Sequence, residues 1–214
     1  MKTLIDAPGD ARAAYVLAHG AGAGMRHPFM QSIAEGLAAR GIAVLRYEFA
    51  YMEQGGKRPD PPKVAEARVR EAVEEAGRRF PGLPLFAGGK SFGGRMTSQA
   101  EAAHALPGVH GLAFLGFPLH PAGKPSDQRA AHLENVKLPM LFLQGTRDSL
   151  ADLALLRPVV ARLGKRATLE TFEEADHSFH VPARTGRKDA DVREDLLDIF
   201  VRWIDAQPRR ALIR

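Results

Sequence analysis

The chain contains no cysteine among its 214 residues, and this absence rules out several kinds of chemistry. Without thiols the protein has no disulfide, no thiolate nucleophile and no cysteine-ligated metal site. Long apolar runs are missing too: none approaches the ~18–20 residues of a membrane-spanning helix, and the segment 1–10 has no apolar signal-peptide core. We therefore expect a cytoplasmic protein with no membrane partner.

The residues that are present are typical of a globular domain. Hydrophobic residues make up 45% and charged residues 26% of the sequence, which are ordinary values, and the length predicts a single domain over 1–214. The net charge is +5, but lysine and arginine are scattered beside acidic residues, except in a basic C-terminal tail at about 207–214. We expect no nucleic-acid partner. An anionic substrate stays open, and so does the choice between monomer and dimer.

Short apolar runs alternate with amphipathic segments along the chain. The runs predict strands at 13–18, 42–47, 83–88, 109–116, 138–144 and 168–172, and 2–6 is a candidate edge strand. Helices are expected near 28–40, 62–80, 92–106, 127–135, 150–164 and 188–206. Near-continuous apolar strands suit a parallel sheet that is covered on both faces. The pattern predicts a three-layer α/β/α fold with a mostly parallel sheet of about six to seven strands.

Gly89-Lys90-Ser91-Phe92-Gly93 fits the pattern G-x-S-x-G between a predicted strand and a predicted helix. In that setting the pattern is typical of a nucleophile elbow, a sharp turn that exposes a serine hydroxyl above the sheet. The flanking glycines are expected where a Cβ would collide with neighbouring elements. The alternative is a structural turn in which Ser91 caps the helix. We expect the Lys90 side chain to point away from the site.

An acid and a histidine follow the serine in the order that a Ser-Asp-His triad takes on such a sheet. Asp148 and His177 each come just after a predicted strand. Because parallel strands end at one edge of the sheet, these loops should converge on the turn of Ser91. Ser91 is then the nucleophile, His177 the base and Asp148 the group that orients the histidine. Asp152 is the competing acid, and a helix N-cap and a surface-loop histidine are the alternatives for Asp148 and His177.

A glycine-rich segment, His19–Gly24, follows the first predicted parallel strand. In a hydrolase of this type, the loop after that strand donates one backbone N–H to the oxyanion hole, and the residue after the serine donates the other. We assign these donors to Ala21 or Gly22 and to Phe92. The rival interpretation is a dinucleotide-binding loop with Glu48 on the ribose, but the third glycine of that fingerprint is absent.

Together these segments resemble the α/β-hydrolase superfamily, and more closely its small, lidless bacterial members that are relatives of dienelactone hydrolase. The match is carried by His19–Gly24, Leu45–Phe49, Gly88–Met96, Gln144–Asp148 and Ala175–Phe179. Dienelactone hydrolases use a cysteine nucleophile, which this chain lacks. The resemblance implies serine-dependent hydrolysis of an ester-like bond without implying a particular substrate. Some eukaryotic relatives serve as subunits of chromatin complexes, so a non-catalytic role stays open.

We therefore expect a serine hydrolase, best interpreted as a carboxylesterase, that acts on a small-molecule ester through an acyl-serine. Thioesterase or acyltransferase chemistry needs the same residues, and a binding or scaffold module with an idle triad is the rival class. No insertion is long enough for a large lid, so a small, open pocket is expected. Its expected substrate contacts are His27, Tyr51, Met52, Phe117 and His120. No cofactor is expected and no metal ion, because the histidines at 177 and 180 have no carboxylate cluster beside them.

Overall fold

One seven-stranded sheet runs through the structure, a computed structural model that describes residues 1–208. Its strands are β1 (Thr3–Asp6), β2 (Ala13–Ala18), β3 (Ile42–Tyr47), β4 (Leu85–Lys90), β5 (Val109–Leu115), β6 (Met140–Gly145) and β7 (Ala167–Phe172). They lie in the order β1-β3-β2-β4-β5-β6-β7. The β1–β3 pair is antiparallel and the other neighbouring pairs are parallel. Most of the basic tail predicted at 207–214 lies outside the described residues.

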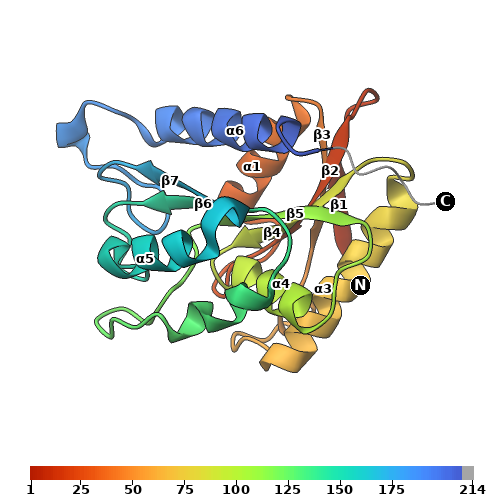
Figure 1. Ribbon diagram of the computed structural model, residues 1–214. Helices are drawn as coiled ribbons and strands as arrows, with labels where there is room; N and C mark the ends of the chain where they lie inside the picture. Colours follow the sequence, from red (N-terminus) through yellow and green to blue (C-terminus); the bar gives the residue numbers. More distant parts are fainter. Residues whose placement is uncertain (209–214) are drawn as a thin grey trace.

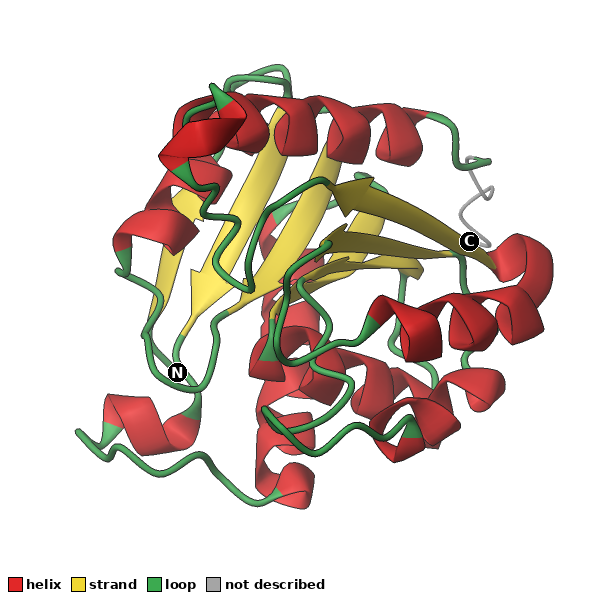
Figure 2. Ribbon diagram, turned by 90° about the vertical axis from the view of Figure 1, so that its left-hand side faces the viewer, coloured by secondary structure: helices red, strands yellow, loops and turns green. Residues whose placement is uncertain are grey.

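Helices cover both faces of this sheet (Figures 1 and 2). They are α1 (Pro28–Ala38), α2 (Ala50–Glu53), α3 (Pro62–Arg79), α4 (Phe92–Ala103), α5 (Leu153–Leu163) and α6 (Asp189–Asp205), with the 3₁₀ helices η1 (Gln128–Asn135), η2 (Gly164–Arg166) and η3 (Ala183–Thr185). On one face α1 and α6 pack against each other, and on the other lie α3, α4, α5 and η1. The predicted three-layer α/β/α fold is confirmed.

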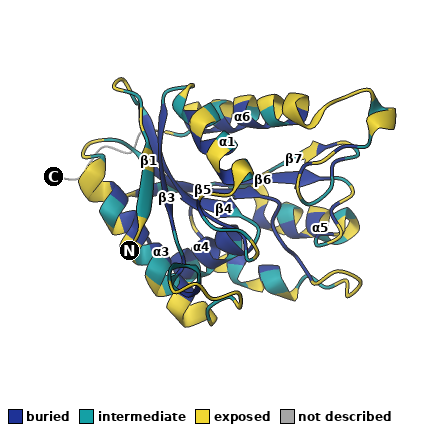
Figure 3. Ribbon diagram, turned by 180° about the vertical axis from the view of Figure 1, so that it is seen from behind, coloured by how far each residue is buried: buried dark blue, intermediate teal, exposed yellow. Residues whose placement is uncertain are grey.

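The sheet divides the hydrophobic core into two halves, and successive side chains of a strand enter different halves. In β2, Tyr15 and Leu17 pack toward α1 and α6, whereas Ala14 and Val16 pack toward α3 and α4. Every residue of β2 and β3 is buried, and Figure 3 shows these strands between helices whose outer faces are exposed. Burial on both faces is the reason that the strands read as almost unbroken apolar runs.

The predicted elements agree with the observed ones to within a few residues, and two details differ. The loop expected after the second parallel strand begins with the short helix α2, and the helix expected at 127–135 is the 3₁₀ helix η1. The buried residues of η1, Ala130 and Leu133, are three positions apart. This is the repeat of a 3₁₀ turn, and over so short a segment it looks the same in sequence as an α-helix.

Loops follow the carboxyl ends of the parallel strands, which is the edge where open α/β sheets bind ligands. Within residues 1–208, no large lid covers this edge, and no helix is long and apolar enough to cross a bilayer. The residues of these loops are therefore the ones that can form a site.

The turn from β4 to α4 is tight, as the G-x-S-x-G pattern predicts. Ser91 has φ 50°, a left-handed conformation that is strained for a residue with a side chain. A Cβ on Gly89 would stand 2.1 Å from the backbone oxygen of Ala18 in β2. One on Gly93 would stand 2.5 Å from the oxygen of His19. The two glycines thus allow β2 to pass directly behind the turn that carries Ser91.

Replacing Gly89 with alanine should destabilise the protein by about 3 kcal/mol or more, because the methyl group meets fixed backbone at φ 145°. Gly9→Ala is the matched control. Nothing lies within 4 Å of its Cβ position, so its effect should stay within about 0.5 kcal/mol. Urea unfolding followed by circular dichroism measures both variants, and equal midpoints would contradict this packing.

Candidate active site

Three side chains from separate loops meet at the C-terminal edge of the sheet. Ser91 follows β4, Asp148 follows β6 and His177 follows β7. His177 Nε2 lies 2.8 Å from Ser91 Oγ, and its Nδ1 lies 2.7 Å from Asp148 Oδ2. The three residues form one continuous hydrogen-bonded chain, in which the imidazole bridges a hydroxyl and a carboxylate.

Asp148 is the most enclosed member of this chain, because its side chain has no exposed surface. Its Oδ2 also accepts a hydrogen bond from Gln144 Nε2 at 2.5 Å, and its Oδ1 accepts one from the Leu150 amide at 2.8 Å. Gln144 is itself buried and accepts from the Phe117 amide. A carboxylate held on both oxygens keeps one orientation toward His177. Sequence analysis missed Gln144, and the available signal was an amide at the end of an otherwise apolar strand.

The competing acid, Asp152, has a different place. It caps α5, where its Oδ1 accepts from the Ala154 amide at 2.8 Å. Its own amide donates to His120 Nε2 at 3.0 Å. The carboxylate that contacts His177 is therefore that of Asp148.

A cavity of about 400 Å³ opens beside Ser91 and His177. It lies between the glycine-rich loop, the start of α1 and the loop at 177–178. Its walls are mostly apolar and include Ala23, Phe29 and Met30. Of the five residues expected to contact substrate, His27 lines this cavity.

The other four expected contacts are not among the residues that line this cavity. Phe117 is fully buried and packs against phenylalanines of the core. His120 is buried and is held by the first turn of α5. Met52 packs against the core beside α3 and α4, and Tyr51 turns toward the glycine-rich loop. The segments after β3 and β5 fold inward, and sequence periodicity carries no information about the direction that a loop takes.

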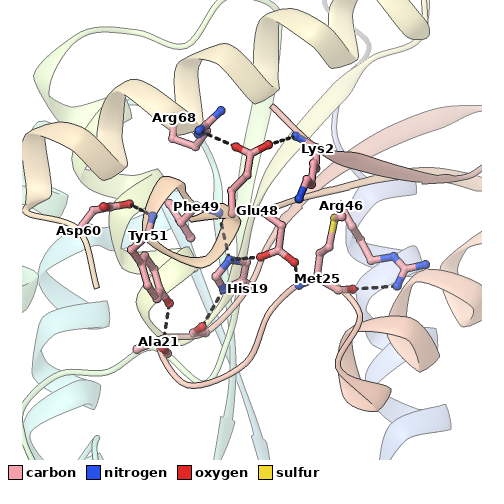
Figure 4. A network of polar contacts seen from close by, with 12 residues as sticks. Lys2, His19, Ala21, Met25, Arg46, Glu48, Phe49, Tyr51, Asp60 and Arg68 are labelled. Atoms are coloured by element: carbon pink, nitrogen blue, oxygen red, sulfur yellow. Dashed lines mark hydrogen bonds and ion pairs between the residues drawn. The ribbon is translucent and has the colours of Figure 1, made fainter. Parts of the chain in front are cut away.

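Two side chains hold the glycine-rich loop in place (Figure 4). Tyr51 Oη donates to the Ala21 carbonyl at 2.8 Å, and His19 Nδ1 lies 2.8 Å from the Gly20 carbonyl. The C=O and N–H of one trans peptide point in opposite directions. Fixing these two carbonyls therefore also fixes the direction of the amides that follow them, which belong to Ala21 and Gly22.

The amides of the three predicted oxyanion donors are unpaired within the described part of the chain. None of residues 1–208 accepts a hydrogen bond from the N–H of Ala21, Gly22 or Phe92. Ala21 and Gly22 line the cavity, and Phe92 follows Ser91 at the start of α4. These amides remain available to a ligand oxygen.

His19 is fully buried, and Figure 4 shows its polar contacts. Burial lowers its pKa, and its Nε2 accepts from the Phe49 amide at 3.1 Å, so the ring proton is on Nδ1 and faces Gly20. Glu48 lies 3.3 Å from Nε2 and accepts from the Met25 amide at 3.2 Å. The carboxylate that a nucleotide-binding interpretation would assign to a ribose thus contacts the segment that follows β2.

Lys90 lines the cavity rather than pointing away from the site, which corrects another expectation. Its Nζ donates to the His177 carbonyl, and burial lowers the pKa of its ammonium group to about 8. Two glycines lie against the side chain. The Cβ position of Gly20 is 3.6 Å from Lys90 Cγ, and that of Gly116 is 2.9 Å from Nζ.

A second serine–histidine pair lies between α4 and η1. Ser98 Oγ and His132 Nε2 are 2.8 Å apart, but Ser98 is fully buried and neither residue lines the cavity. Burial, with a contribution from Arg95, lowers the pKa of His132 to about 4. Among the residues that the structure describes, no carboxylate contacts this ring. The pair lacks both an orienting acid and access to a ligand.

The two histidines considered for a metal site face different partners. His180 Nδ1 lies 2.9 Å from Asp189 at the start of α6, whereas His177 faces Ser91. Across residues 1–208, no three or more histidine, aspartate or glutamate side chains are grouped so that they could hold a metal ion.

Known proteins that are similar to this chain are hydrolases. A family model described as alpha/beta hydrolase domain matches residues 11–205. Dienelactone hydrolase from Anabaena variabilis has a TM-score of 0.77 at 20% identity, over 97% of this chain and 92% of that one. A lidless serine hydrolase from Xanthomonas campestris has 0.72 at 23% identity, over 96% and 90%. Monoacylglycerol lipase from Paleococcus ferrophilus has 0.73 at 17%, over 94% and 98%. At these identities the structural likeness establishes the fold.

The surroundings of His132 predict how stability depends on pH. Above pH ~6.5 the ring is neutral in both the folded and the unfolded chain. As the pH falls from there to about 4, the unfolded chain binds a proton that the folded protein does not. The free energy of unfolding should fall by about 3 kcal/mol over this range. Urea unfolding at several pH values measures it, and His132→Gln should flatten the decline. Parallel curves for the two proteins would contradict the buried, neutral ring.

Proposed function

The chain belongs to the alpha/beta hydrolase domain family, and we propose that it is a serine hydrolase that cleaves an ester-like bond, with carboxylesterase activity. The observation that supports this function is the hydrogen-bonded chain from Ser91 through His177 to Asp148 beside the cavity. A serine hydroxyl is a weak nucleophile until a base takes its proton. Here His177, the base, is within hydrogen-bond distance of Ser91, and Asp148, which orients the base, is within hydrogen-bond distance of His177.

In the proposed reaction, His177 Nε2 takes the proton of Ser91 Oγ while this oxygen attacks the carbonyl carbon of the ester. Asp148 faces Nδ1–H, stays ionised and stabilises the imidazolium that forms. The imidazolium then gives its proton to the departing alkoxide, which leaves an acyl-serine. A water molecule that His177 deprotonates attacks this intermediate, and the products are a carboxylic acid and free Ser91.

We assign the oxyanion hole to the amide of Phe92 and to that of Ala21 or Gly22. As Ser91 attacks, negative charge develops on the carbonyl oxygen, and preorganised N–H groups stabilise it without having to reorganise. The assignment rests on the unpaired amides and on the fixed orientation of the glycine-rich loop. One such donor typically contributes ~10²–10³ in rate.

The dimensions of the cavity favour a small substrate. About 400 Å³ of mostly apolar space lies beside Ser91, near the lower end of the usual ~300–1,000 Å³ for small-molecule sites. Within residues 1–208 no lid adds an acyl-chain tunnel to it. We therefore propose short-chain, water-soluble esters as substrates in preference to long-chain lipids.

Labelling with a fluorophosphonate should place a single adduct on Ser91, because among the serines of residues 1–208 this one alone combines a base with access to the cavity. Ser91→Ala should abolish labelling and reduce p-nitrophenyl acetate turnover to the residual ~10³–10⁴-fold acceleration of binding and the oxyanion hole. Ser98→Ala, which removes the serine of the second pair, should keep both. Mass spectrometry locates the adduct. An unlabelled but folded wild type would favour a binding module with an idle triad.

Tyr51→Phe should lower kcat for p-nitrophenyl acetate by roughly tenfold with little change in KM, because the Ala21 carbonyl loses its anchor while the donor itself remains. Tyr15→Phe is the matched control. Its hydroxyl also donates to a backbone carbonyl, that of Ala113, at 2.8 Å. Tyr15, however, packs toward α1 and α6 and does not line the cavity. The control should lose stability and keep kcat. Equal kinetics in the two variants would show that Tyr51 does not position the oxyanion donors.

A further inference from the structure

The cavity contains a lysine that the proposed mechanism does not use. Lys90 directly precedes Ser91, and its side chain runs along the sheet edge beneath Gly20 toward His177. Its Nζ donates to the His177 carbonyl and lies 5.9 Å and 5.5 Å from the ring centroids of Phe29 and Phe179. These contacts hold the ammonium group in place and use one of its three hydrogens.

No carboxylate within the described chain forms an ion pair with this ammonium group. The nearby acids are Asp148 and Asp176, and neither forms an ion pair with Nζ. Asp148 is held by His177 and Gln144. Asp176 accepts hydrogen bonds from two backbone amides of its own loop. Lys90 is thus a cation enclosed at the site without a carboxylate partner among residues 1–208.

The rest of the wall makes this arrangement costly in the absence of a ligand. Ala23, Phe29, Met30 and Leu150 give the cavity a mostly apolar surface, and a charge in such surroundings loses hydration that only a partner can replace. A ligand carboxylate would supply charge-assisted hydrogen bonds to Nζ, which are stronger in a dry site than in water. The cation also lies near the imidazole of His177. Nζ and His177 Nδ1 lie 2.9 Å and 3.3 Å from the Cβ position of Gly116, so Nζ is close to the side of the ring that faces Asp148, while Lys90 also lines the cavity that Ser91 opens into.

We propose that the substrate of this site is a short ester that also carries a carboxylate, and that Lys90 is the residue that selects it. This rests on the proposed ester hydrolysis and adds the chemical class of the substrate. Lys90 makes no bond to the reacting atoms and undergoes no chemical change. Its role is to pair with a charge elsewhere on the substrate while Ser91 attacks the ester carbonyl.

The test compares matched esters that differ in charge. One pair carries the charge on the alcohol half: 4-acetoxybenzoate and the neutral 4-acetoxybenzamide. The other carries it on the acyl half: the p-nitrophenyl monoester of adipate and p-nitrophenyl hexanoate. In at least one pair the wild type should prefer the charged ester by about tenfold or more in kcat/KM. The responsive pair identifies the half that faces Lys90.

Two variants separate selection from the positioning of His177. Lys90→Met should abolish the preference for the charged ester, whereas Lys90→Arg, which keeps the cation, should retain most of it. Loss of the contact with the His177 carbonyl can slow both esters of a pair, so the readout is the ratio of their kcat/KM values. A ratio near one in the wild type, or one that Lys90→Met leaves unchanged, overturns the proposal.

Binding measured in a protein that cannot turn over keeps this proposal distinct from the proposed function. On the Ser91→Ala background, calorimetry should give about tenfold tighter binding of 4-acetoxybenzoate than of 4-acetoxybenzamide, and adding Lys90→Met should remove the difference. Equal affinities overturn the anionic substrate class even if the wild type is an active esterase. If the affinities differ but fluorophosphonate does not label the wild type, the anion site is retained and the proposed hydrolase activity is rejected.

Discussion

The close passage of β2 behind the turn from β4 to α4 is the constraint on which the site depends. Gly89 and Gly93 leave no side chain between the turn and the Ala18 and His19 backbone, and the Ser91 amide is tied to the Leu115 carbonyl in β5 at 3.2 Å. A non-glycine residue with positive φ costs of order 1–3 kcal/mol and persists only where its surroundings impose it. Here neighbouring strands on both sides impose it, and the same strands bring the other functional loops to the same edge.

Two sets of buried hydrogen bonds support the candidate site. One runs from the Phe117 amide through Gln144 to Asp148, and the other joins Tyr51 and His19 to the glycine-rich loop. In each, every polar group is paired, so each link is costly to break. Ser98 and His132 show what happens without such supports: the same two functional groups at the same distance form an inert structural contact.

The sequence predicts the parts of the candidate site that follow from topology. Ser91 and Asp148 follow apolar, buried strands and His177 follows the mixed edge strand β7, and parallel strands place the residues after them at one edge of the sheet. Tyr51, Phe117 and His120 also follow strands, but their loops turn inward, a direction set by packing against α3, α5 and the core. Lys90 was misjudged for a related reason, because the residues that surround its side chain, such as Gly116 and His177, are distant in sequence.

A site without a moving cover must distinguish its ligands in another way from an enzyme that closes over its substrate. Closure lets an enzyme spend binding energy on assembling its site around the correct molecule. In the described part of this chain, the cavity wall is complete before a ligand arrives, and wall residues such as His27 and Met30 belong to a different segment from the base and the acid. Single substitutions in the wall can therefore change the affinity for a substrate without changing the residues proposed to carry out the reaction. On such a scaffold, related proteins can keep one mechanism while they act on different substrates.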